Sequence, residues 1–155
     1  LEVYKANATE LPFDDAMFDV VYSFKVLAHV EAIDTALREM ARVTRKNGIL
    51  LLEFYNWMSL RYLAKRVAGP QKISQETHEG AVYTRWDSPA DLARRLPENL
   101  SLVDYKGVRV LTPLAAAHRV PIVGSLLRRL EHHAKDSPLR YFGGFLVAVV
   151  EKELG

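Results

Sequence analysis

Two short stretches in the N-terminal third place polar and aromatic side chains directly after apolar runs. The first covers residues 23–25, with His29 four positions later, and the second covers residues 55–57. In open parallel sheets, ligands bind beyond the carboxyl ends of the strands. If both apolar runs are parallel strands, the two stretches meet at one ligand site, although this rule gives a place and no chemistry. His29 could orient a ligand or act as a base, but the favoured interpretation is that it only satisfies a helix N-terminus.

The residues between these stretches predict the elements that position them. Residues 20–22 and 49–52 are β-favouring apolar runs, and continuous runs are typical of parallel strands covered on both faces. An apolar stripe at helical spacing lies between them, and it consists of Ile33, Ala36, Leu37, Met40 and Val43. Asn47-Gly48 is expected to end this helix through a left-handed residue. Residues 18–56 therefore predict a strand, a helix and a second, parallel strand.

Length and composition favour a single α/β domain. The chain has 155 residues, of which 49% are hydrophobic and 26% charged, as is ordinary for globular proteins. A net charge of +2 is too small to argue for nucleic-acid binding. The absence of cysteine excludes disulfides, thiolate metal sites and a cysteine nucleophile. No apolar run approaches the ~18 residues of a membrane span and no signal peptide is visible, so a cytoplasmic location is expected.

The remainder of the chain predicts further strands and helices. Alternating or apolar patterns predict strands at residues 1–6, 100–111 and 142–150, with Gly107 as a candidate bulge. Helical patterns cover residues 57–67, 112–117 and 121–133. A further short helix should begin at Ser88-Pro89, because a capping residue followed by proline is a strong start signal.

Other groups of functional side chains have simple structural explanations. A solvated turn and a strand entry explain three carboxylates better than a metal site does; these are Asp14, Asp15 and Asp19. The spacing of three histidines does not suit one metal ion, so no metal site is predicted; they are His118, His132 and His133. One basic cluster could meet an anionic substrate or a membrane surface, although a solvated helix face is the commoner explanation; it contains Arg128, Arg129, His132, His133 and Lys135.

The N-terminal half resembles the class I S-adenosylmethionine-dependent methyltransferases. The resemblance is carried by NATELPFDDAMFDVVYSFKVLAHV and then LREMARVTRKNGILLLEFYN. The family pattern is an acidic corner followed by L-P-F, an F-D-x-V strand, an L-x-H near the next helix, and an R-V-x-x-x-G-G-x-L strand entry. Several spaced elements agree in order, over roughly residues 1–56. The small-molecule branch that includes quinone-biosynthesis methyltransferases is the most similar.

The resemblance implies a Rossmann-like, mostly parallel α/β sheet with a C-terminal antiparallel hairpin, and S-adenosylmethionine as cofactor. It implies cofactor contacts from Asn7, Ala8, Thr9, Ser23, Phe24, Lys25 and His29. Substrate contacts are expected from Tyr55, Asn56, Trp57, Tyr83 and Arg85, although such residues are as often structural. His29 is the weak candidate for catalysis. Residues 1–155 would form a single, partial domain, in which residues 57–90 and 112–140 are cap insertions over the substrate.

Three departures from the family pattern qualify this expectation. Asn7 stands where the family usually has aspartate, and an amide still accepts a hydrogen bond but without charge. Residues 7–9 could equally form a turn closed by the asparagine side chain. Asn47-Gly48 replaces a glycine pair. The family's first strands, glycine-rich loop and ribose-binding acid have no counterpart, since no glycine precedes Gly48; an N-terminal truncation is expected, which would leave residues 1–6 without their usual strand partners.

Two functions follow, and another nucleotide-using α/β enzyme is a weaker third. The first is methyl transfer from S-adenosylmethionine to a small-molecule acceptor by the parent protein, with this fragment alone incompetent. Because the sulfonium is already a strong electrophile, alignment and desolvation supply much of such catalysis, and no base need stand out in the sequence. The alternative is a truncated or degenerate methyltransferase fold that serves as a non-catalytic partner module.

Overall fold

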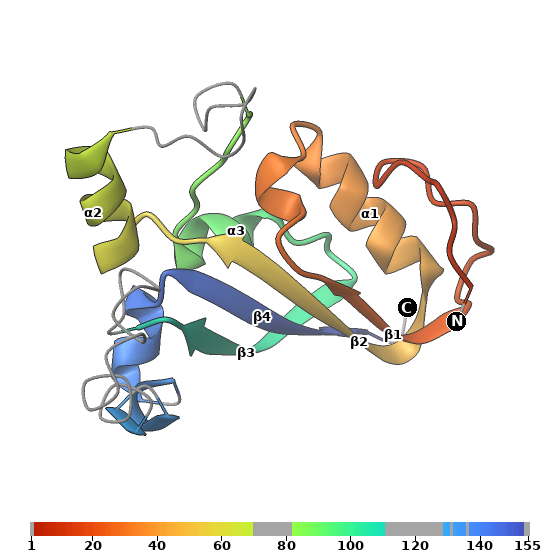
Figure 1. The fold of residues 1–155 in the computed structure, drawn as a ribbon. Helices are drawn as coiled ribbons and strands as arrows, with labels where there is room; N and C mark the ends of the chain where they lie inside the picture. Colours follow the sequence, from red (N-terminus) through yellow and green to blue (C-terminus); the bar gives the residue numbers. More distant parts are fainter. Residues whose placement is uncertain (1, 70–81, 111–128, 131, 136, 154–155) are drawn as a thin grey trace.

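A four-stranded mixed sheet forms the centre of the protein (Figure 1). The computed structural model describes residues 2–69, 82–110, 129–130, 132–135 and 137–153. The strands are β1 (Phe18–Ser23), β2 (Thr44–Tyr55), β3 (Leu100–Val108) and β4 (Phe145–Lys152), in the spatial order β1-β2-β4-β3. Strands β1 and β2 are parallel, whereas β4 runs antiparallel to both β2 and β3. The predicted parallel pair and C-terminal antiparallel pair are therefore confirmed.

Helix α1 (Ile33–Val43) connects the parallel strands and covers one face of the sheet. All five predicted stripe residues are at most 6% exposed, so the predicted helix and its buried face are confirmed. The stripe packs on Leu50 and Leu52 of β2 and on Ala148 of β4, which form the other half of the core. Burial of a leucine side chain contributes about 2 kcal/mol, and this interface supplies several such residues.

The predicted helix end at Asn47-Gly48 is wrong. Helix α1 ends at Val43, and the chain enters β2 directly at Thr44, whose hydroxyl donates to the carbonyl of Met40 at 2.6 Å. Asn47 does adopt the left-handed conformation, with φ of 59°, but within the first part of β2. A side chain at Gly48 would lie 2.7 Å from Thr44 and 3.0 Å from the carbonyl oxygen of Asp19. Gly48 therefore serves close packing against β1, not helix termination.

The C-terminal pair differs from prediction in its details. The irregularity of β3 lies between Leu102 and Asp104 and not at Gly107. Gly107 instead allows a close approach, because an added Cβ would lie 2.5 Å from the carbonyl oxygen of Arg140. That oxygen belongs to the 3-10 helix η4 (Pro138–Phe142), so β4 begins three residues later than predicted.

Three further elements lie at the end of the sheet where the site was predicted. Helix α2 (Leu60–Ala68) confirms the predicted helix after β2, and the short helix η1 (Leu27–His29) follows β1. Helix α3 (Pro89–Arg95) begins as predicted at Ser88, which forms a reciprocal capping box with Asp91. The predicted helix 112–117 and most of the helix 121–133 fall outside the described residues. No helix in the described part of the chain is long and apolar enough to cross a membrane.

The N-terminal residues do not form the predicted strand. Residues 2–6 belong to no strand, and they are exposed. The next segment is held to α1 by Arg42, whose guanidinium donates to the carbonyls of Leu11 and Phe13 and to the carboxylates of Asp15 and Glu39. Arg42 therefore holds residues 11–15 beside the helix, together with a hydrogen bond from the Leu11 amide to Glu39 (Figure 1).

The contact between Arg42 and Glu39 should be sensitive to acid. Hydrogen bonds from Arg42, and secondarily from the Leu11 amide, lower the pKa of Glu39 to about 2. A carboxyl whose pKa is lower when folded adds stability above its unfolded pKa of about 4.3, and this stability is lost as the pH falls towards 2. We expect Glu39→Gln to lower the free energy of unfolding at pH 7 and the deficit to vanish near pH 2. Urea unfolding between pH 7 and 2 measures this.

The matched control is Glu31→Gln, because Glu31 is also a carboxylate in this region but is exposed. Its unfolding curve should follow the wild type at every pH. A deficit for Glu39→Gln that stays constant from pH 7 to 2 would contradict the assignment.

The capping box predicts a second stability effect. Ser88 accepts a hydrogen bond from the Asp91 amide at 3.1 Å, and Asp91 accepts one from the Ser88 amide at 3.0 Å. Removal of a serine cap costs about 1 kcal/mol. Ser88→Ala should therefore lower the free energy of unfolding by about 1 kcal/mol in urea at pH 7. Ser101→Ala, at a half-buried position of β3 whose hydroxyl bonds to the exposed Glu153, should stay within about 0.5 kcal/mol of wild type, and equal effects of the two changes would refute the cap.

Candidate functional site

The loop after β1 is held in place by a buried carboxylate of β2. Lys25 has a left-handed backbone, with φ of 59°, and its amide donates to Oε1 of Glu53 at 3.2 Å. Glu53 is 7% exposed although it lies near the end of an apolar strand. The carboxyl end of β2 therefore fixes the loop at residues 23–25, as expected if the two stretches form one site.

Glu53 was not among the predicted site residues. Burial raises the pKa of Glu53, while the Lys25 amide and the positive charges of Lys25, Arg61 and Arg109 act in the opposite direction. Nearby positive charges only partly offset the effect of burial on this carboxyl. A buried carboxyl with a shifted pKa is more typical of a functional site than of a core. The available signal was one acidic residue inside the apolar run LLLEF.

His29 and Tyr55 meet where the two parallel strands end. Nδ1 of His29 lies 2.8 Å from the carbonyl oxygen of Tyr83. A carbonyl only accepts, so Nδ1 carries the proton, and in the neutral ring Nε2 has the lone pair. The Tyr55 hydroxyl lies 3.4 Å from Nε2. His29 ends η1, and no side chain caps α1, so the structure does not place it at a helix N-terminus.

An aromatic cluster surrounds the guanidinium of Arg61, a residue of α2. Its central carbon lies 4.5 Å from the ring centre of Phe145, 5.2 Å from that of Tyr55 and 5.7 Å from that of Trp86. Such stacking is worth about 0.5–2 kcal/mol per arginine and fixes its direction. It therefore joins α2 to the ends of β2 and β4.

Two of the predicted substrate residues are used inside the protein. The Asn56 side chain is 0% exposed; it donates to the carbonyls of Tyr141 at 2.8 Å and Gly143 at 2.9 Å. Arg85 forms an ion pair of 2.7 Å with buried Asp87. These contacts hold the segments around β2 together. The exposed predicted substrate residues are Trp57 and Tyr83, whereas Tyr55 is half-buried.

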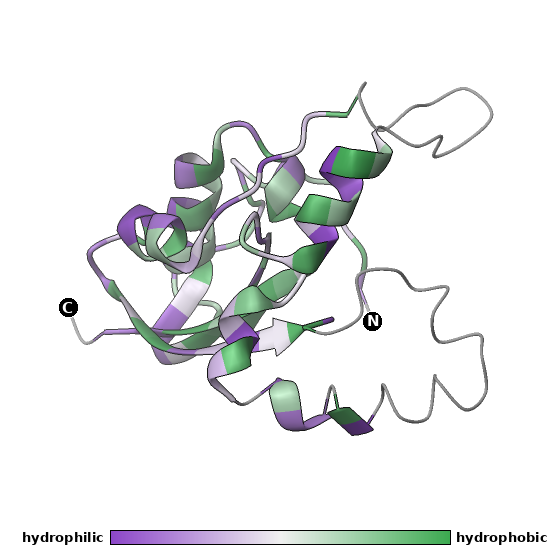
Figure 2. Cartoon of the chain, turned by 90° about the vertical axis from the view of Figure 1, so that its left-hand side faces the viewer, coloured by the Kyte–Doolittle hydropathy of each residue, from purple (hydrophilic) through white to green (hydrophobic). Residues whose placement is uncertain are grey.

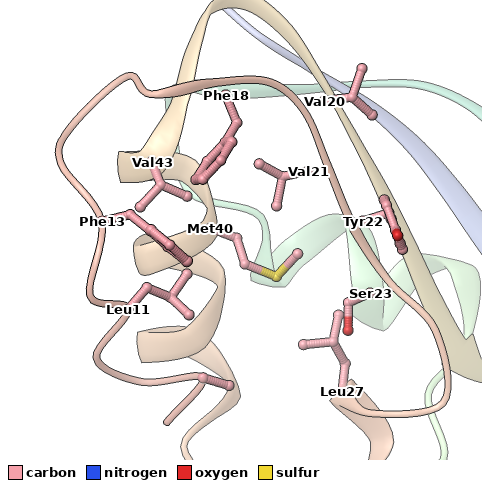
Figure 3. Close-up of a pocket in the computed structure, with 11 residues that line it drawn as sticks. Leu11, Phe13, Phe18, Val20, Val21, Tyr22, Ser23, Leu27, Met40 and Val43 are labelled. Atoms are coloured by element: carbon pink, nitrogen blue, oxygen red, sulfur yellow. The ribbon is translucent and has the colours of Figure 1, made fainter. Parts of the chain in front are cut away.

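An apolar cavity of about 300 Å³ lies between β1 and the N-terminal loop (Figure 3). Ala8 and Ser23 both line it, so it brings together two of the predicted cofactor-binding segments. Leu11, Val21 and Met40 point into the same space. The cavity lies within the usual size range of ligand pockets, at its lower end.

Residues 7–9 form the turn that the sequence offered as the alternative to a cofactor contact. Oδ1 of Asn7 accepts the Thr9 amide at 3.1 Å, which is a turn closed by the asparagine side chain. This bond uses one lone pair of the oxygen and leaves the other available.

The remaining candidates lie apart from this site. Asp14, Asp15 and Asp19 are all exposed, and Asp15 pairs with Arg42 and Asp19 with Arg45 at 2.7 and 2.8 Å. His118 and Arg128 fall outside the described residues. Among the residues that the structure describes, no group of three or more His, Cys, Asp or Glu side chains could hold a metal ion.

Sequence comparison relates the chain to methyltransferases. Residues 1–52 match the family model described as "Methyltransferase domain". A demethylmenaquinone methyltransferase of Mycolicibacterium paratuberculosis is 32% identical over 135 residues, which cover 74% of this chain and 56% of that protein. A ubiquinone biosynthesis O-methyltransferase of Pelagibacter ubique is 26% identical over 109 residues, covering 68% of this chain and 44% of that protein. The chain thus spans about half the length of these relatives.

Comparison with solved structures relates the fold to the same class. A methyltransferase of Thermotoga maritima, described as a possible histamine N-methyltransferase, aligns with a TM-score of 0.65 at 16% identity, covering 99% of this chain and 65% of that one. The [4+2]-cyclase SpnF aligns with a TM-score of 0.55 at 17% identity, covering 97% and 55%. At such identities the likeness shows the fold alone.

Sequence and fold lead to the same conclusion. Residues 1–52 carry the methyltransferase-domain signature, and the strand order and helices of the described residues have methyltransferases as structural neighbours. The chain is therefore related to the S-adenosylmethionine-dependent methyltransferases, including those of quinone biosynthesis, and it carries the class I fold of that family.

Proposed function

We propose that the protein to which this chain belongs transfers a methyl group from S-adenosylmethionine to a small-molecule acceptor. The observation that carries the proposal is the cavity along β1, which Ala8 of the N-terminal loop and Ser23 at the carboxyl end of β1 both line. Ligands of open α/β sheets bind beyond the carboxyl ends of the strands, where Ser23 ends β1, and the matching methyltransferase-domain model covers both Ala8 and Ser23. The acceptor would be a quinone-type ring, as the names of the relatives suggest.

The chain's own residues fit one side of such a cofactor. The loop at residues 23–25 is fixed by Glu53, so its backbone is already ordered for a ligand. The Asn7 oxygen keeps one lone pair for an amino group, as an adenine carries. We propose that the cofactor contacts Asn7, Ala8, Thr9, Ser23, Phe24, Lys25 and His29. When bound, the cofactor supplies an electrophilic methyl group.

The acceptor would lie beside the aromatic side chains at the end of β2. Tyr55, Trp57 and Tyr83 present apolar surface with polar edges, which suits a flat ring. Nε2 of His29 has a lone pair and lies beside the Tyr55 hydroxyl. Nε2 could therefore take a proton from a hydroxyl group of the methyl acceptor. The cytoplasm remains the expected location for such a reaction.

Cofactor binding is tested by titrating the isotope-labelled chain with S-adenosylhomocysteine and recording amide NMR spectra. We expect shifts at residues 7–9, 23–25 and 29, with weak affinity, because these residues supply one side of the site. Ala8→Phe should fill the cavity and weaken binding about tenfold or more, since overpacking costs 1–3 kcal/mol. Ala6→Phe is the control, because Ala6 is exposed two positions away.

Two outcomes would contradict this proposal. Shifts confined to other residues would refute the assigned cofactor contacts. No shift with millimolar ligand, together with no transfer of labelled methyl to demethylmenaquinol by the longest protein that contains this chain, would favour the non-catalytic partner module.

The burial of Glu53 leads to a separate prediction about the stability of the fold. Its pKa is raised by burial, so the neutral form is favoured in the fold, and stability is lost as the pH rises through the folded pKa. Glu53→Gln should therefore raise the free energy of unfolding at pH 7, with the gain vanishing near pH 4, as measured in urea. Glu151→Gln, on an exposed position of the same sheet face, should change little. A less stable Glu53→Gln protein at pH 7 would refute the inference.

A further inference from the structure

Helix α2 stands on the protein surface without a buried residue of its own. Its apolar side chains Leu60, Leu63 and Val67 are 50%, 59% and 83% exposed. They recur at spacings of three and four residues, so they form one stripe along the helix. In Figure 2 the helix faces the viewer, and hydrophobic and hydrophilic residues alternate along it. An amphipathic helix normally buries this stripe against the core, and α2 does not.

The exposed stripe continues into the residues before the helix. Trp57 is 47% exposed and Met58 is 39% exposed. Together with Leu60, Leu63 and Val67 they border an open hollow of about 590 Å³. Large apolar side chains that gather in this way, and are not scattered singly, mark an interaction surface.

The charged residues of the segment that carries the stripe have a single sign. Residues 57–69 contain Arg61, Lys65 and Arg66 and no aspartate or glutamate. Arg66 lies at the border of the hollow itself, and Lys65 and Arg66 are in the last turn of the helix. The complementary partner is therefore apolar in its interior and negatively charged at its surface.

The base of the helix is anchored. Ser59 caps α2 by accepting the Tyr62 amide at 3.1 Å, and its hydroxyl donates to the carbonyl of Asn56 at 2.6 Å. Buried Asn56 in turn donates to the backbone of residues 141 and 143. Arg61 stacks on Phe145 from the inner side of the helix. The apolar stripe is thus presented outward by a fixed support.

We propose that α2 and residues 57–58 dock on an anionic phospholipid bilayer, with the apolar stripe in the interface and Lys65 and Arg66 at the phosphates. An interfacial helix combines a leucine- and tryptophan-containing face with lysine and arginine on the polar face, and tryptophan favours the headgroup level. A helix of nine residues is about 13 Å long and buries few side chains, so its binding needs the electrostatic contribution.

Docking would place the candidate site at the membrane surface. Arg61 of the same helix stacks on Tyr55, whose hydroxyl faces His29. An acceptor with a lipid tail could then present its ring to the site without leaving the bilayer. This last point rests on the proposed function, whereas the docking itself does not.

The test is co-sedimentation of the full chain with vesicles of phosphatidylcholine alone and of phosphatidylcholine with one quarter phosphatidylglycerol. We expect binding to the anionic vesicles that weakens with salt, and little binding to the neutral ones. Leu63→Asp should abolish binding, and Val3→Asp should not, because Val3 is equally apolar and 86% exposed in the N-terminal segment. Circular dichroism confirms that each variant is folded.

Two matched double variants test the electrostatic contribution to membrane binding. Lys65→Gln with Arg66→Gln should lower the partition coefficient roughly tenfold or more, since each basic residue near an anionic surface is worth about fivefold. Arg38→Gln with Arg94→Gln removes the same charge from exposed positions of α1 and α3 and should have little effect. A shift of Trp57 fluorescence to shorter wavelength in a Trp86→Phe background reports insertion.

Three results would overturn the proposal. These are no binding of the wild-type chain to anionic vesicles, equal binding of Leu63→Asp, and equal losses for the two charge-removing pairs. If the stripe instead serves a protein partner, vesicles will not bind. S-adenosylhomocysteine binding is read separately, so failure of docking and failure of the proposed function are distinguishable.

Discussion

Strand β2 is hydrogen-bonded along both edges, to β1 in parallel and to β4 in antiparallel register, and the rest of the structure depends on this double pairing. Because successive side chains of a strand point to opposite faces, β2 supplies two surfaces at once. Leu50, Leu52 and Phe54 face α1 and are at most 1% exposed. Glu53 and Tyr55 face the other way, towards the loop after β1 and the ring cluster of α2. The same strand thus builds the core and the candidate site.

The end of β2 also fixes segments that are distant in sequence. Asp87 donates its amide to the carbonyl of Tyr55 at 2.8 Å, and Arg85 donates its amide to the carbonyl of Ala28 at 2.8 Å. The segment at residues 82–88 therefore bridges the ends of both parallel strands. This bridge places the carbonyl of Tyr83 against His29 and so selects the tautomer of the imidazole. The chemistry available at His29 is set by backbone contacts and not by its own loop.

Neither the buried carboxyl of the candidate site nor the apolar stripe beside it favours the stability of the fold. Glu53 is buried in a position that favours its neutral form, and the apolar stripe of α2 gains nothing from the core. Folding alone would favour an apolar residue at the first position and a polar face on the second. Both features lie at the same end of the sheet, on either side of the ring cluster around Arg61. Their shared location supports the two proposals made above, an apolar acceptor ring and docking at an interface.

The sequence by itself determined the parallel pair, α1 with its buried stripe and the cap of α3 at Ser88, because periodicity, capping and strand order are local or short-range signals. It could not determine what Asn47-Gly48, Gly107 and Asn56 do. Each of these roles depends on a contact with a residue distant in sequence. Gly48 packs against Asp19, Gly107 packs against Arg140, and Asn56 donates a hydrogen bond to Tyr141. The tertiary structure alone decided that Glu53 reaches the Lys25 amide and that His29 faces Tyr55. Hydrogen bonds of this kind join residues 26 or more positions apart, and no periodic pattern along the chain encodes them.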